Sequence, residues 1–196
     1  MCNSFVVPAL GLSGGLWVMW NDEVDVNIVS SCHYYVLASV AHKSNSSSIN
    51  LIRMYGDPHH QHTNSIWSDV FTFIMQNQGI PTLCMGDLNN IMHPNENWRY
   101  GPPSLAQIDN FCSLIKQCGL MDLGFSGPAY TWTNKRFTTN PTFEHLDRCL
   151  GDAEWYRVFP FTVVYHLPML YSDRTPILAI MNPNRAKPKW RFKFQN

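Results

Sequence analysis

The sequence predicts a single domain of the mixed α/β class. Short runs of β-branched and aromatic residues fill the first third of the chain, and apolar residues recur at helical spacing after them. With 196 residues, of which 45% are hydrophobic, the chain is long enough to bury one substantial core. It is too short for two full domains.

Charge and composition narrow the classes of partner. The 14 basic residues balance the 14 acidic ones, so no global positive field attracts nucleic acid, and any DNA contact must be local. The start of the chain lacks the pattern of a signal peptide, and no run of eighteen apolar residues occurs. We therefore expect an intracellular protein, nuclear or cytoplasmic, that is not secreted and has no membrane partner.

The first part of the chain predicts strands and one helix. Runs at 15–20, 24–30, 34–41 and 49–55 have strand composition, and the polar turn at 21–23 indicates a hairpin. From Thr63 the apolar residues share one helical face, and Gly79 ends this helix. The loop before it contains His59, His60 and His62, which we expect to be solvated.

The second part continues the mixture. The nearly all-apolar run 81–85 predicts a strand covered on both faces, with the polar cluster 86–90 at its carboxyl end. A second helix begins after Ser104, a suitable N-cap, and ends near Gly119. Further strands are expected at 130–134, 144–150, 161–166 and 176–180, with a helical turn at 152–158.

The C-terminal tail is the one basic segment. From Arg185 onward, basic residues alternate with Pro, Trp and Phe, which fits either an edge strand or a disordered linker. We therefore divide the chain into a domain at 1–182 and a basic-aromatic tail at 183–196.

Three carboxylates each lie beside an apolar strand: Asp87, Asp147 and Asp173. A cluster of carboxylates at strand ends becomes tolerable when a divalent cation neutralises it, and hard oxygen ligands favour Mg²⁺ or Mn²⁺. Alternatively, each Asp caps a turn or pairs with Arg148 or Arg174. The residues alone leave both interpretations open.

Taken in order, these segments resemble the endonuclease/exonuclease/phosphatase superfamily, and in particular the endonuclease domain of plant LINE-type (non-LTR) retrotransposons. The resemblance covers most of the chain. The ordered matches lie at 11–20, 55–58, 86–90, 119–128, 130–134, 146–148, 166–168 and 172–173. The resemblance implies a DNase I-like α/β fold, in which a two-sheet β-sandwich is flanked by helices in four layers, with the site at one end.

The resemblance also implies roles for individual residues. Asp87 would orient or deprotonate the attacking water, and Asn89 would hold the water or a phosphate oxygen. Asp147 would orient the catalytic imidazole, and Asp173 would lie at the metal end of the site. The remaining two positions are Tyr55, which would contact the scissile phosphate, and Asn134, which would steady the neighbouring loop. Asp173 and Asp87 are the candidate metal ligands.

Two departures from the family pattern predict loss of activity. Arg174 stands where the family has His after the Ser-Asp pair, and arginine cannot exchange a proton near neutral pH. Family members also begin with strands ending in an Asn-x-Arg-Gly type motif and in a metal-binding Glu. This chain starts at about the following segment, so we expect an N-terminally truncated domain that lacks the first strands and that Glu. Glu96 is the nearest replacement, but its loop predicts a solvated side chain.

The sequence is compatible with three functions. The first is a Mg²⁺- or Mn²⁺-dependent endonuclease acting on the DNA phosphate backbone, joined to a reverse transcriptase segment in the parent element. The second is a non-catalytic remnant, or pseudoenzyme, that binds phosphate or nucleic acid, and Arg174 favours it. The third is a small-molecule phosphatase of the same superfamily.

Overall fold

The early strands form two separate pieces of sheet. The computed structural model describes residues 3–11, 14–44, 47–99 and 101–182. Strand β1 (Asn3–Val7) pairs antiparallel with β2 (Leu16–Trp20). Strands β3 (Val24–Ser31), β4 (Tyr35–His42) and β5 (Ser48–Tyr55) form an antiparallel meander. The four strands predicted between residues 15 and 55 are thus confirmed, whereas β1 was not predicted.

The meander belongs to a central sheet of six strands. Its order is β3-β4-β5-β6-β11-β8, where β6 is Thr82–Asp87, β8 is Met121–Asp122 and β11 is Asp147–Gly151. The pair β5 and β6 is parallel, because helix α1 (Thr63–Gln76) supplies the crossover that parallel strands require. Tyr55 and Asp87, the last residues of these two strands, therefore lie side by side at the same end of the sheet.

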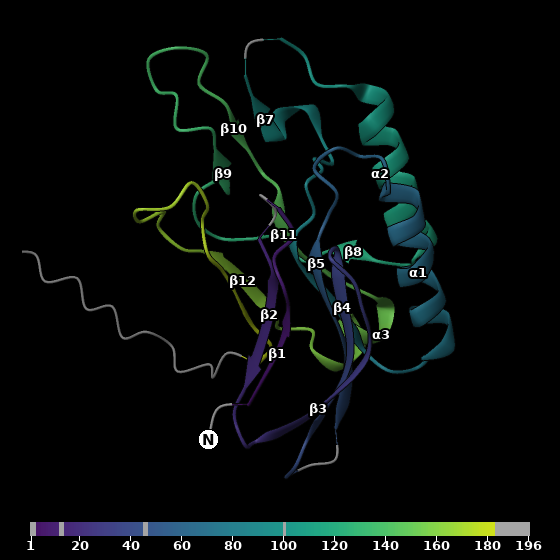
Figure 1. The fold of residues 1–196 in the computed structure, drawn as a ribbon. Helices are drawn as coiled ribbons and strands as arrows, with labels where there is room; N and C mark the ends of the chain where they lie inside the picture. Colours follow the sequence, from purple (N-terminus) through teal and green to yellow (C-terminus); the bar gives the residue numbers. More distant parts are fainter. Residues whose placement is uncertain (1–2, 12–13, 45–46, 100, 183–196) are drawn as a thin grey trace, which may run out of the picture.

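Two helices cover one face of this sheet (Figure 1). Helix α2 (Leu105–Gln117) is capped by Ser104, whose hydroxyl accepts a hydrogen bond from the backbone N–H of Gln107. Trp67 and Phe73 of α1 and Phe111 of α2 are buried against Ile52. The apolar spacing predicted both helices and most of their core-facing residues, but Phe71 and Met75 of the predicted face of α1 are exposed.

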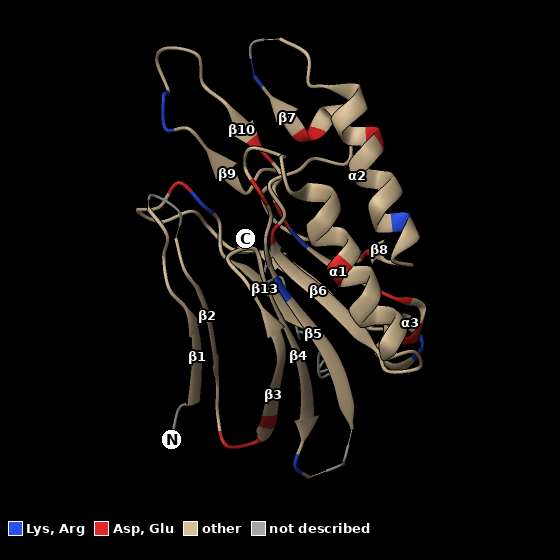
Figure 2. Ribbon diagram, turned by 45° about the vertical axis from the view of Figure 1, so that its right-hand side comes forward, with Lys and Arg blue, Asp and Glu red and all other residues tan. Residues whose placement is uncertain are grey.

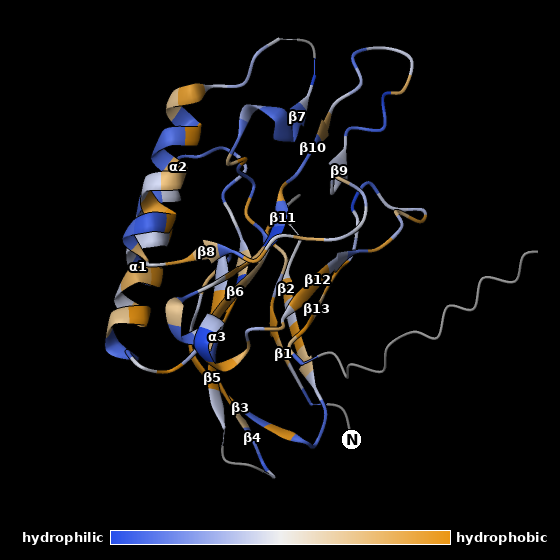
Figure 3. Ribbon diagram, turned by 180° about the vertical axis from the view of Figure 1, so that it is seen from behind, coloured by the Kyte–Doolittle hydropathy of each residue, from blue (hydrophilic) through white to orange (hydrophobic). Residues whose placement is uncertain are grey.

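Two hairpins lie against the opposite face. One is β1–β2, and the other joins β12 (Val163–His166) to β13 (Ile177–Ile180). Figure 3 shows hydrophobic residues along these strands. Trp155 of the short helix α3 (Ala153–Val158) is fully buried in the cluster beside β12. The predicted α/β sandwich is confirmed, and in the described part of the chain its second layer consists of these hairpins.

A small three-stranded sheet stands at one end of the molecule. It pairs β10 (Phe143–Glu144) with β7 (Asn97–Trp98) on one side and β9 (Trp132–Thr133) on the other. The 3-10 turn η1 (Pro94–Glu96) leads into it. Among the described helices, none has the length and apolar character of a membrane span. The tail 183–196 lies outside the described residues.

Candidate active site

Three strand ends bring the predicted site residues into register. On the central sheet, Asp87 of β6 lies opposite Tyr55 of β5 on one side and Asp147 of β11 on the other. The alternation of each strand points the two carboxylates to the face that carries the hairpins. Asp87 is thus flanked by Tyr55, which is 32 residues away in the sequence, and by Asp147, which is 60 residues away.

Arg174 lies between the two carboxylates. Its Nη2 is 2.6 Å from Asp87 Oδ2, and its Nη1 is 3.3 Å from Asp147 Oδ2. The Asp87 contact is a close ion pair rather than an aligned hydrogen bond, so Asp87 Oδ2 has no aligned donor among the described residues. The sequence left open whether these carboxylates cluster or pair with an arginine. The structure shows both, because Asp87 and Asp147 lie side by side and each contacts Arg174.

Burial sets the protonation of Asp87. Loss of solvation raises the pKa of this carboxyl to about 6, and the negative charge of Asp147 adds to the rise. The charge of Arg174 and the backbone N–H of Asn89 oppose it. Asp87 can consequently change its charge close to neutral pH.

Asn89 is held by a tight approach of two chain segments. It adopts the left-handed conformation, with φ of 49°, and its N–H donates to Asp87 Oδ1 over 3.0 Å. Its Nδ2 donates to the carbonyl of Gly56. A Cβ at Gly56 would collide with the backbone of Leu88, so only glycine fits there. The loops after β5 and β6 are fixed to each other at the site.

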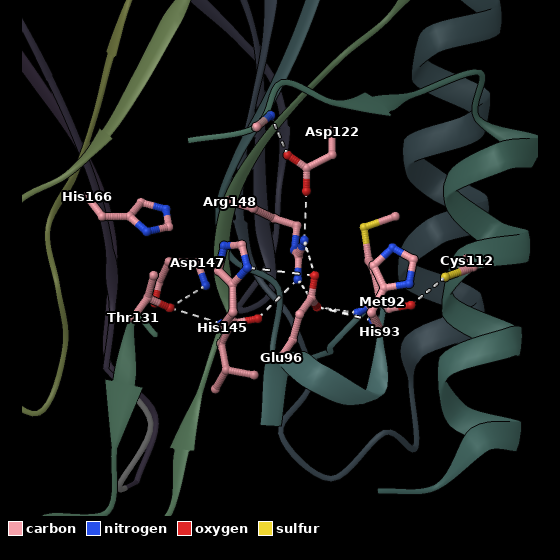
Figure 4. A network of polar contacts seen from close by, with 12 residues as sticks. Met92, His93, Glu96, Cys112, Asp122, Thr131, His145, Asp147, Arg148 and His166 are labelled. Atoms are coloured by element: carbon pink, nitrogen blue, oxygen red, sulfur yellow. Dashed lines mark hydrogen bonds and ion pairs between the residues drawn. The ribbon is translucent and has the colours of Figure 1, made fainter. Parts of the chain in front are cut away.

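A buried arginine supports the strand that carries Asp147. Arg148 is only 2% exposed, and it forms ion pairs with Glu96 Oε2 at 2.6 Å and with Asp122 Oδ2 at 2.7 Å. Figure 4 shows this network, together with Thr131, whose Oγ1 accepts the backbone N–H of Asp147 over 2.9 Å. The contacts on both sides of β11 hold Asp147 in place.

This network corrects the prediction for Glu96. The side chain is 14% exposed rather than solvated, because Arg148 binds it from a strand 52 residues away. Burial by itself would raise the pKa of Glu96, but His145 and Arg148 lower it to about 2. Glu96 is therefore the ion-pair partner of Arg148 and does not replace the family's metal-binding Glu beside Asp87.

Asp173 and Asn134 line a neighbouring hollow. The carboxylate of Asp173 is exposed and contacts the hydroxyl of Ser172, and it shares this hollow with Lys135 and Arg136. Asn134 donates to the carbonyl of Asn140, and its Oδ1 accepts the backbone N–H groups of Arg136 and Thr142. The structure thus places Asp173 beside the Asn134 loop and does not bring it to Asp87.

The site opens into a hollow of about 290 Å³. Its lining includes the predicted residues Tyr55, Asn89 and Arg174. It also includes Trp132, Glu144 and the half-buried His60, to which the sequence analysis assigned no role in the site. His60 was expected in a solvated loop, and Trp132 and Glu144 were expected on strands at 130–134 and 144–150, where nothing marked them as site residues.

The described side chains do not fit a divalent cation at this point. In the described ranges, no three Asp, Glu, His or Cys side chains gather where they could hold a metal ion. Arg174 already supplies positive charge to Asp87 and Asp147. We therefore assign no step to a metal.

Comparison with known proteins identifies the fold. No family model matches the sequence, and no curated protein is similar to it. The structure is similar to the endonuclease domain of TRAS1, a telomere-specific non-LTR retrotransposon, with a TM-score of 0.73, 14% identity, and coverage of 94% of this chain and 81% of that one. It is also similar to the AP endonuclease LMAP from Leishmania major, with a TM-score of 0.71 and 13% identity over 93% of this chain and 71% of that one.

A third neighbour carries the name of the superfamily. It is an endonuclease/exonuclease/phosphatase family protein from Bacteroides thetaiotaomicron, with a TM-score of 0.53, 9% identity, and coverage of 91% of this chain and 74% of that one. This chain has the endonuclease/exonuclease/phosphatase fold. The resemblance found in the sequence is thereby confirmed at the level of that fold.

Proposed function

We propose that this chain is an endonuclease-type domain that binds the phosphodiester backbone of DNA and does not cleave it. The single observation behind this proposal is the pair of contacts from Arg174 to Asp87 and Asp147. In the family pattern a His follows the Ser-Asp pair. Arg174 keeps the positive charge that grips a phosphate oxygen but cannot exchange a proton near neutral pH.

The proposed binding mode uses the residues around the 290 Å³ hollow. The guanidinium of Arg174, the hydroxyl of Tyr55 and the amide of Asn89 provide hydrogen-bond donors on its lining. Lys and Arg segments lie on loops at the end of the molecule that carries the small sheet (Figure 2). Local positive charge of this kind suits a polyanion even though the chain has no net charge.

A retroelement origin is part of the proposal. The ordered motifs resemble plant LINE-type endonuclease domains, and the TRAS1 domain is among the structural neighbours. On this interpretation a reverse transcriptase segment belongs to the parent element. A small-molecule phosphatase is the second candidate, because a mannosyl-6-phosphatase from Bacteroides thetaiotaomicron has a similar structure with a TM-score of 0.53. Hydrolysis of p-nitrophenyl phosphate would favour that candidate.

The first test is cleavage of supercoiled plasmid in Mg²⁺ and, separately, in Mn²⁺. We expect the natural chain to nick no faster than the Asp87→Asn variant, because loss of a general acid or base alone slows such a reaction by about a hundredfold or more. Arg174→His is measured beside them. Nicking by the natural chain that requires both the metal and Asp87 would show that the domain is an active nuclease.

The second test measures binding of a fluorescent DNA duplex by anisotropy over a range of salt concentrations. Arg174→Gln should weaken binding and reduce the slope of log affinity against log salt by about one, as expected for one lost phosphate contact. Lys43→Gln is the matched control, since Lys43 pairs with Asp25 at the opposite end of the sheet.

A double variant separates direct contact from net charge. Asp87→Asn together with Arg174→Gln removes one charge of each sign and leaves the local sum unchanged. If the guanidinium contacts phosphate, this variant binds more weakly than the natural chain, although loss of the Asp87 charge makes it bind more tightly than Arg174→Gln alone. Binding at the natural level in both variants would rule out Arg174 as the phosphate ligand.

A further inference from the structure

A second hollow, of about 630 Å³, lies on the hairpin side of the central sheet, next to the proposed DNA site. Its walls are mainly apolar. They are formed by Met85, Leu167, Pro168, Leu170, Pro176 and Ile177. Arg53, Gly86, Asp147 and Arg174 also line it. An apolar cavity with a few polar groups is the usual form of a small-molecule site.

Arg53 is directed to this face by the alternation of β5. Its neighbours Ile52 and Met54 belong to the core under the helices, whereas Leu51 packs in the cluster on the other side. The guanidinium crosses directly over Gly86, where any Cβ would overlap Nη1. Glycine at this position therefore makes room for the arginine.

The charge of Arg53 has no close counterion. Its hydrogen bonds run from Nη1 to the carbonyl oxygens of Met54 and Met85, and among the described residues it forms no ion pair. Loss of solvation lowers the pKa of Arg53, although the more distant charges of Asp147 and Asp87 counteract this. Both of those carboxylates are in contact with Arg174.

A partly buried guanidinium without a carboxylate partner is costly, and an anion that reaches it offsets this cost. The apolar walls beside it add a requirement for an apolar body on the same ligand. We propose that this hollow binds a phosphate monoester carried on an aromatic or apolar group. The phosphate lies against Arg53, and the apolar group lies on the wall that includes Leu167, Leu170 and Ile177.

The test uses phenyl phosphate as the probe, with inorganic phosphate and benzyl alcohol as half-ligands, in calorimetric titrations of the full chain. Phenyl phosphate should bind at least about tenfold more tightly than either half-ligand. Arg53→Met should weaken phenyl phosphate by about tenfold or more. The charge-matched control Arg157→Met, at an exposed position on α3, should have no effect.

A second variant protects the test against loss of folding. Leu170 is 69% exposed, so Leu170→Ser leaves the core intact and keeps the charge while removing part of the wall. It should weaken phenyl phosphate by about fivefold and leave DNA binding unchanged. Equal binding of phenyl phosphate by the natural chain and both variants overturns the proposal, as does absence of binding to the natural chain. Neither outcome bears on the DNA proposal, which the Arg174 variants test.

Discussion

At the scale of single residues, the site is defined by how its charges compensate one another. Two carboxylates share one guanidinium, and the side chain of Asp87 is 5% exposed. Burial therefore acts on Asp87 more strongly than its ion pair does, and its pKa rises to about 6. The protonation of this one group determines how much of Arg174's charge is available to a ligand.

This predicts that DNA binding depends on pH. As the pH falls from 7.5 to 5, Asp87 gains a proton and loses the negative charge that repels a phosphate. Affinity for a DNA duplex at constant ionic strength should rise over this interval. In Asp87→Asn that contribution is absent, so its binding curve should be flatter and its affinity at pH 7.5 higher. An equally steep rise in the variant would assign the effect to histidines elsewhere.

At the scale of elements, strand β11 depends on the network around Arg148. The arginine links β11 to η1 through Glu96 and to β8 through Asp122. Removing one partner of a buried ion pair costs more than the pair itself contributes, because the other charge stays behind. Acid should therefore loosen this part of the molecule by protonating Glu96.

The sign of this effect follows from the pKa of Glu96, which is lowered to about 2 in the folded chain. Its contribution to stability is complete above the unfolded value of about 4.3 and is lost as the pH falls toward 2. Between pH 7 and pH 3, urea unfolding should show a loss of stability from Glu96 on the order of 2 kcal/mol in the natural chain, and this loss should be absent in Glu96→Gln. Asp109→Asn, at an exposed position of α2, is the control and should behave like the natural chain.

Elements with a period could be predicted from the sequence, and those without one only in part. The apolar face of α1 recurs every three to four residues, and the strands between residues 15 and 55 carry β-branched and aromatic runs. Of the two-residue strands, β9 lies within the strand predicted at 130–134 and β10 overlaps the one predicted at 144–150, whereas β7 was not predicted. Their positions depend on pairing with distant segments.

At the scale of the whole molecule, some site residues could be foreseen from the sequence, and others are placed only by contacts between distant segments. Asp87 is the last residue of β6 and Asp147 the first of β11, and their meeting was implied by the family resemblance rather than by the residues alone. The orientation of Asp173 and Arg174 depends on a loop whose backbone pairs with Trp132 and Thr133, and no local pattern reveals this pairing. Glu96 was misjudged because its partner Arg148 is on another element. The missed contacts all join segments that are far apart in the chain.

The position of Arg148 next to Asp147 also protects the chain against misalignment. Neighbouring residues on a strand face opposite sides, so sliding β11 by one place would exchange the two. Asp147 would then face Glu96 and Asp122, and three carboxylates would meet without a cation, while Arg148 would be set against Arg174. A one-residue shift would thus create like-charge contacts on both faces of the sheet. The strand is therefore restricted to the one alignment that forms the site.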